Sequence, residues 1–199
     1  MKSMRRKPIN IIVIIGIIAI IAIWVISAYN GLVKKDEACS QQWSKVESQY
    51  QRRLDLIPNL VNTVKGYASH EKQTLTDVVN ARNIAATNKV DPNDLTQESL
   101  DKFQQSQAAL KSSLDRLMVV VERYPDLKAN QNFLELQSQL EGTENRIAVE
   151  RQKFADIINA FNSKLRRFPT NIIAGMFGFE RKAYFSADKG AENAPKVEF

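Results

Sequence analysis

The sequence is poor in the residues from which many enzyme and metal sites are built. It contains one cysteine, Cys39, and one histidine, His70. A single cysteine cannot form an internal disulfide, and a single histidine excludes di-iron bundle sites with two Glu-x-x-His pairs and zinc sites with several Cys and His ligands. No glycine-rich phosphate loop, calcium-loop spacing or local catalytic motif is present. The sequence therefore predicts a non-enzymatic protein without a cofactor, a metal or a small-molecule substrate.

Glycine and proline are also scarce, with seven and six residues. Both residues interrupt helices, so their scarcity favours long helices and an all-α fold. Cys39 falls on an apolar helical seam and is predicted to be a small core residue. His70 has no catalytic partner nearby and is predicted to be an exposed helical residue.

A long stretch without charge is the feature around which the chain is organised. Residues 11–29 contain no charged side chain and no proline. About 20 apolar residues are needed for a helix to cross a bilayer, so we predict a transmembrane helix over 9–29. A cleaved signal peptide is the alternative, but this run exceeds the roughly 7–15 apolar residues of a signal sequence.

The net charge of +6 is concentrated at the N-terminus. Four basic residues lie within residues 1–8, whereas the rest of the chain has 24 basic and 22 acidic residues. The basic residues therefore indicate topology and do not indicate nucleic-acid binding. The predicted arrangement is a single-pass protein of the bacterial cytoplasmic (inner) membrane, with residues 1–8 in the cytoplasm and the remainder outside.

Four amphipathic helices are predicted after the span, over residues 31–57, 58–88, 96–124 and 130–167. Pro58 is expected to end the first, and Pro125 the third. Apolar residues recur every three or four positions in the third helix, and every seven in the fourth. Because the first three helices are similar in length, we predict an antiparallel up-and-down four-helix bundle over 30–168, with its first reversal at Pro58.

An apolar segment over residues 169–185 follows the bundle, and 186–199 is predicted to be a flexible tail. We expect the apolar segment to lie near the bilayer and to offer a contact surface for a protein or the membrane. The alternative is that it packs against the base of the bundle. The predicted surface comprises Ile172, Ile173, Met176, Phe177 and Phe179.

Four polar residues occupy helical positions that would otherwise be apolar. Counting down from the expected turns places Asp36, Arg82, Gln107 and Glu150 at similar depth near the membrane. We predict a buried polar layer in which Arg82 pairs with Glu150 or Asp36, because an unpaired buried charge is costly. The alternative is that these side chains turn outward to water.

Several separated motifs resemble the LemA family. They are residues 52–61 (RRLDLIPNLV), 140–147 (LEGTENRI) and 166–169 (RRFP). The resemblance implies a single-pass bacterial membrane protein with an antiparallel helical bundle and no established activity. It also implies an N-terminus outside the cell, whereas the charges of this chain predict the opposite.

The leading functional hypothesis is a membrane-anchored helical interaction or scaffold protein of the bacterial envelope. Its expected partners are the lipid bilayer and an envelope membrane protein or a second copy of the chain. The alternative is a membrane sensor or signalling subunit that acts through a partner protein. A further possibility is that a partner captures residues 195–199.

Overall fold

A computed structural model describes residues 6–92 and 95–186, in which every regular element is an α-helix. This confirms the all-α prediction of a long apolar N-terminal helix followed by a helical bundle. The helices are α1 (Arg6–Tyr67), α2 (Lys72–Thr87), α3 (Gln97–Val121), α4 (Pro125–Lys128), α5 (Gln131–Arg166) and α6 (Thr170–Met176).

Helix α1 continues through Pro58, so the predicted break at this residue is wrong. The helix has 62 residues and is about 90 Å long. Pro58 has no N–H to donate to the carbonyl of Leu54, one turn earlier. Arg82 of α2 replaces that donor, with its Nε 3.3 Å from the Leu54 oxygen. The proline side chain is exposed, so its ring takes no space in the core.

The first reversal of the bundle instead lies at residues 68–71, between α1 and α2. His70 is exposed, as predicted, but it lies in this turn and not in a helix. The Glu71 carboxylate accepts hydrogen bonds from Arg123 and Tyr124, at 3.0 and 3.1 Å. One acidic side chain therefore joins the turn after α1 to the turn after α3, at the end of the bundle farthest from the apolar part of α1, the distal end.

Side-chain caps define the starts of α3 and α5 where the sequence indicated them. The Thr96 hydroxyl accepts a hydrogen bond from the Ser99 N–H, and the Asn130 side chain accepts one from the Phe133 N–H. Such caps satisfy N–H groups that have no partner in the first helical turn. They explain why these two boundaries agree closely with prediction.

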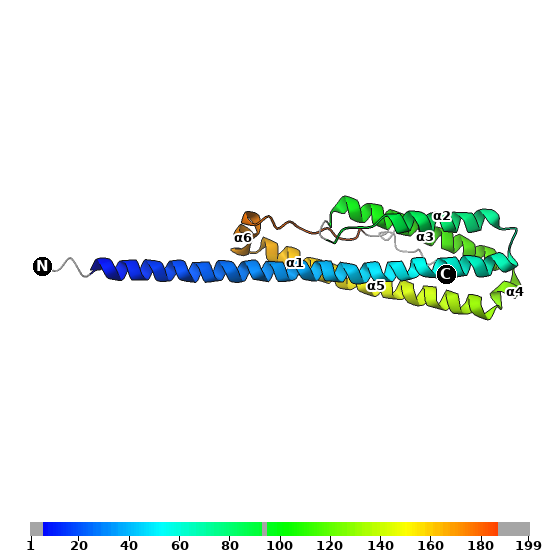
Figure 1. The fold of residues 1–199 in the computed structure, drawn as a ribbon, viewed down its shortest axis with the longest axis horizontal. Helices are drawn as coiled ribbons and strands as arrows, with labels where there is room; N and C mark the ends of the chain where they lie inside the picture. The colour runs from blue at the N-terminus through cyan, green and yellow to red at the C-terminus, as the bar shows by residue number, and fades with distance from the viewer. Residues whose placement is uncertain (1–5, 93–94, 187–199) are drawn as a thin grey trace, which may run out of the picture.

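The helices run up and down in an antiparallel bundle, and α1 extends beyond it on the left in Figure 1. Helix α5 lies along α1, while the shorter α2 packs against α3. Helix α2 has 16 residues and α5 has 36, so α2 runs beside only part of the bundle. The half of the bundle nearest the apolar part of α1, the proximal half, therefore needs other segments to complete it.

The core consists of two clusters of buried apolar side chains. The proximal cluster is centred on Trp43, Phe154 and Phe161. The distal cluster includes Leu60, Leu117 and Phe133. Cys39 is fully buried in the proximal cluster, in agreement with its predicted role as a core residue.

The chain after α6 completes the proximal half. Asn162 forms two hydrogen bonds with the backbone of Lys182, at 2.9 and 3.0 Å. The ring of Phe185 then packs against Trp43 and Phe154, with centroids 5.8 and 5.6 Å away. The 169–185 segment is thus an integral part of the bundle. Most of the predicted tail, 187–199, lies outside the described residues.

Candidate functional site

The N-terminal half of α1 presents a continuous apolar surface. Isoleucines along residues 11–26 are more than half exposed, and none of this stretch packs into the bundle before Val25. Within the described chain, α1 is the one helix long and apolar enough to cross a membrane. This surface is a possible membrane anchor, because a bilayer would cover what water otherwise contacts.

Helix α6 lies where that apolar surface ends. The Phe177 and Phe179 rings contact Tyr29, at centroid distances of 4.8 and 5.8 Å. Val25 and Ala28 of α1 also pack against the proximal core cluster. The base of the bundle therefore overlaps the last turn of the apolar stretch.

The predicted contact surface is divided between two faces of this segment. Ile172, Met176 and Phe177 are exposed, at 51%, 73% and 52%. Ile173 is buried and Phe179 packs against the proximal core, so these two residues do not belong to an open surface. One face of the segment thus packs against the bundle and the other is exposed, and the contact surface on the exposed face stays a prediction.

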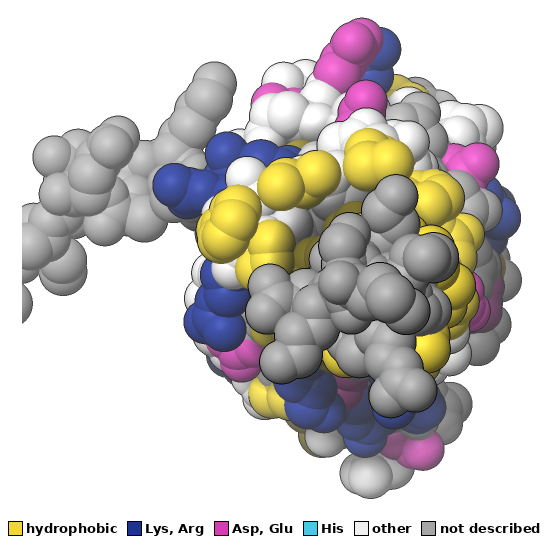
Figure 2. All heavy atoms as spheres, turned by 90° about the vertical axis from the view of Figure 1, so that its left-hand side faces the viewer, with side chains coloured by type: hydrophobic (Ala, Val, Ile, Leu, Met, Phe, Trp, Pro, Cys, Tyr) yellow, Lys and Arg dark blue, Asp and Glu magenta, His cyan; other side chains and the backbone are white. Residues whose placement is uncertain are grey.

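Phe168 continues the seven-residue spacing of Phe154 and Phe161, but it is the most exposed large apolar residue of the bundle. Its side chain is 81% exposed, beside the exposed Arg166 and Arg167. The signal that it leaves the seam is Pro169, because proline disfavours helical backbone in the residue before it, and α5 ends at Arg166. Figure 2 looks along the molecule from this end and shows hydrophobic side chains with Lys and Arg side chains near its left and lower edges.

The predicted polar layer of Asp36, Arg82, Gln107 and Glu150 does not form, because each residue has different partners. Arg82 bonds to the Leu54 carbonyl, and Asp36 forms an ion pair with Lys182 at 3.0 Å. Glu150 accepts hydrogen bonds from Lys153 and Gln42, and these bonds hold the pKa of Glu150 below its usual value. Of the four, Gln107 alone enters a buried layer of the predicted kind.

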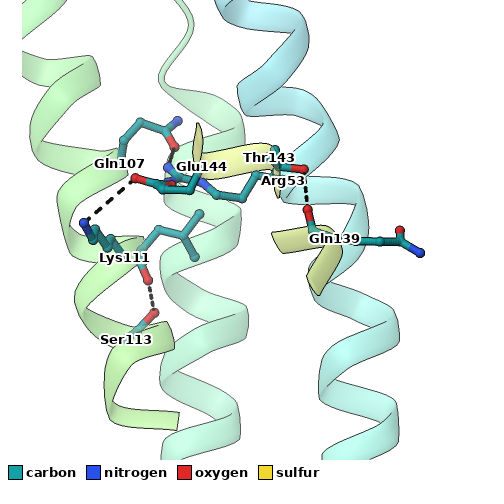
Figure 3. Close-up of polar contacts among 8 residues, drawn as sticks. Arg53, Gln107, Lys111, Ser113, Gln139, Thr143 and Glu144 are labelled. Carbon is teal, nitrogen blue, oxygen red and sulfur yellow. Dashed lines mark hydrogen bonds and ion pairs between the residues drawn. The ribbon is translucent and has the colours of Figure 1, made fainter. Parts of the chain in front are cut away.

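That layer is centred on Arg53 of α1, whose side chain is about 5% exposed. Arg53 donates to Gln107 of α3 at 2.6 Å and to Glu144 of α5 at 2.9 Å (Figure 3). Its guanidinium also lies 5.1 Å from the centre of the Tyr50 ring. One buried cation thereby connects three helices at the level where the two core clusters meet.

Helical spacing could have identified Arg53. The seam of α1 reads Val46, Tyr50 and Ile57, and the 3/4 pattern requires an inward residue at 53 or 54. Both are buried, since Leu54 faces the distal core cluster and Arg53 lies beside it. A seam arginine was overlooked because long charged side chains ordinarily extend to water.

A cleft of about 670 Å³ opens beside this layer. Helices α3 and α5 form its walls, and α1 contributes Tyr50 and Arg53. Charges of both signs line it, including Lys111, Arg151 and Asp101. Burial raises the pKa of Tyr50 above its usual value, although nearby Arg151 and Arg53 oppose the shift. Among the described residues, no group of three His, Cys, Asp or Glu side chains is placed to hold a metal ion.

Comparison with known proteins decides the family. The model of the LemA family matches residues 42–199, which is most of the chain. The chain belongs to the LemA family. Its match includes the Arg53 layer, the cleft and the base of the bundle, but not the apolar half of α1.

Relatives of this LemA-family protein include magnetosome proteins. It is 24% identical to magnetosome protein MamQ 2 of Paramagnetospirillum magneticum, over 98% of this chain and 79% of the relative. It is 25% identical, with the same coverage, to MamQ of Magnetospirillum gryphiswaldense. It is also 24% identical to protein LemA of Metamycoplasma hominis, over 80% of this chain and 69% of the relative. Together these similarities indicate a membrane-associated helical protein.

The LemA-like motifs coincide with the features described above. Residues 52–61 contain Arg53 and Pro58, and residues 140–147 contain Glu144. The first two motifs therefore meet at the Arg53–Glu144 ion pair. The third motif, 166–169, contains the exposed Phe168 and its two arginines.

Proposed function

We propose that this protein is a non-enzymatic, membrane-anchored interaction module of the bacterial envelope. The observation that carries the proposal is the uninterrupted helix α1, which is exposed and apolar in its first half and forms the core of the bundle in its second. A helix of this kind fixes a bundle rigidly to a bilayer. Among the described residues, the one charged side chain that the fold buries, Arg53, is used to hold three helices together.

The proposed location is the cytoplasmic membrane, with the N-terminus inside and the bundle outside. Lys2, Arg5, Arg6 and Lys7 support this orientation, because basic residues beside a first span are retained in the cytoplasm. The charges after the span, Lys34, Lys35, Asp36 and Glu37, balance each other. The orientation therefore depends on the N-terminal cluster.

Cysteine labelling in intact spheroplasts tests the orientation. Val119 of α3 is 70% exposed, so Val119→Cys should react with a membrane-impermeant maleimide without changing the fold. Wild-type protein is the control, because its only cysteine, Cys39, is fully buried. Labelling of the variant before lysis supports an external bundle, and labelling only after lysis contradicts it.

The interaction itself is tested by photo-cross-linking from different faces of the bundle in living cells. Suitable sites are exposed apolar residues that the fold does not use, namely Ile84 on α2, Val119 on α3 and Val149 on α5. We expect one defined protein, or a second copy of the chain, to be cross-linked from one face and not from the others. Absence of protein adducts from all three faces would contradict an interaction module.

A sensor or signalling subunit is the second candidate, and the continuity of α1 favours it. The helix joins the far end of the bundle to the membrane without a break, so a partner that tilts the bundle would also tilt the membrane helix. In this candidate function, a partner protein would supply the effector domain. Cross-links at the cytoplasmic end that change when the external partner is removed would distinguish a sensor from a tether.

A further inference from the structure

The position of α6 relative to a bilayer follows from α1. The apolar run of α1 ends at Tyr29, and the first charged residue after it is Lys34. Phe177 contacts Tyr29, and Val25 and Ala28 pack against the same end of the bundle. If the run spans the hydrocarbon, α6 lies at the depth of the lipid headgroups.

The outer face of α6 is more apolar than packing requires. Ile173 and Ala174 bury its inner face. Phe168, Ile172, Met176 and Phe177 remain 51–81% exposed on the same end of the molecule. Large apolar side chains clustered on one surface usually mark a contact with a protein or a membrane.

Charge near this end distinguishes between those two contacts. Residues 30–37 and 164–182 contain seven basic and three acidic side chains. The rest of the chain beyond residue 8 has 17 basic and 19 acidic side chains. Positive charge around an apolar surface is the pattern by which interfacial segments bind anionic phospholipids.

We propose that Phe168 and α6 form an interfacial foot that rests in the outer surface of the bilayer. Phe168, Ile172, Met176 and Phe177 enter the boundary between headgroups and acyl chains. Arg166 and Arg167, which are exposed beside Phe168, contact anionic headgroups. The foot and the span together hold the bundle at a fixed angle. Docking of the foot rests on the membrane anchor of the proposed function but requires no protein partner. Its test can therefore succeed or fail independently of the test for a protein partner.

Lipid quenching in nanodiscs tests the depth of the foot in the full-length protein. Met176→Cys carries a bimane fluorophore, and the lipids carry bromine at a shallow or a deep position of the acyl chain. Cys39 does not compete for the label, since it is fully buried and its pKa is raised to about 11. Val119→Cys is the control, because Val119 is equally exposed but lies near the distal end of α3.

We expect shallow bromines to quench the label at position 176 more than deep bromines, and neither to quench the label at position 119. Met176→Glu should abolish the quenching of a reporter at Asn171→Cys, whereas Met176→Leu should preserve it. Because Met176 and Asn171 are exposed, these changes leave the core intact. An unquenched label at 176 would overturn the proposal, and protein cross-links from Met176 in cells would then identify a protein contact.

The headgroup contact has its own test. Protein purified from a mixed bilayer of phosphatidylcholine and phosphatidylglycerol should retain an excess of phosphatidylglycerol, measured by mass spectrometry. Arg166→Gln with Arg167→Gln should reduce that excess, and high salt should do the same. Arg116→Gln with Arg146→Gln is the matched control, because both arginines are exposed away from the foot. Equal retention by the two double variants would overturn the anionic-headgroup contact.

Discussion

At the scale of single residues, Arg53 explains how a bundle with two core clusters holds its register. Burying a cation is costly, and the pairing with Glu144 and Gln107 offsets much of that cost. The offset is incomplete, because the buried Nε has no hydrogen-bond partner within the described residues. A slip of α3 or α5 by one turn would leave the guanidinium unpaired, so Arg53 favours one alignment over its alternatives.

Replacement of Arg53 should therefore be much more damaging than loss of an exposed charge beside it. We expect Arg53→Ala to lower the free energy of unfolding by about 2–4 kcal/mol, because it leaves Gln107 unpaired and opens a cavity. Lys111→Ala is the control, since Lys111 lies 3.9 Å from the same carboxylate but is 59% exposed. It should cost less than about 0.5 kcal/mol. Urea unfolding followed by Trp43 fluorescence measures both, and equal stability of the two variants would contradict the role of Arg53.

Cys39 predicts a second property at this scale, a loss of stability in alkali. Burial and the neighbouring Asp36 raise the pKa of its thiol from 9.0 to about 11. The folded state therefore favours the neutral thiol, so this contribution is complete below pH 9 and is lost as the pH rises towards 11. Replacement of Cys39 by Ala should remove that part of the pH dependence. Unfolding curves between pH 8 and 11 test this, and identical slopes for both proteins would contradict it.

At the scale of helices, the sequence predicted α3 and α5 closely, because local caps and regular seams define them. The first reversal was not predictable from local rules. Pro58 is tolerated through a hydrogen bond from Arg82, which is 28 residues further along the chain. The reversal therefore falls at residues 68–71, and this later turn brings Arg82 opposite Leu54 instead of Glu150. The same shift explains why the predicted polar layer does not form, and Gln107 is the one of its four residues that lies in the Arg53 layer.

The Pro58–Arg82 relationship can be measured as a coupling. We expect Arg82→Ala to cost about 1 kcal/mol in the wild-type background, because the Leu54 carbonyl loses its donor. In Pro58→Ala the backbone N–H of residue 58 supplies the donor, so the same Arg82 substitution should then cost measurably less. Chemical unfolding of the four proteins of this double-mutant cycle gives the coupling energy. Additive effects would show that Arg82 does not compensate for the proline.

At the scale of the whole molecule, one helix carries the apolar anchor, the proximal core and the distal core in succession. The Arg53 layer divides the two cores, and the segment after α6 closes the proximal one. The proximal core is thus completed by residues distant in sequence, whereas the distal core is built from consecutive helices. This difference predicts that the end nearest the membrane can loosen while the far end remains folded.

Substitution of Phe185 tests whether the two cores are separable. Phe185 contacts Trp43 and Phe154, and the Arg151 guanidinium lies 4.4 Å above its ring. Phe185→Ala should weaken the proximal core by about 1–2 kcal/mol, because this half-buried ring loses only part of its packing. Hydrogen exchange should then accelerate around Trp43 but not around Leu60, and Leu117→Ala in the distal core should give the reverse pattern. If either variant accelerates exchange equally in both halves, the Arg53 layer joins the two cores into one cooperative unit instead of separating them.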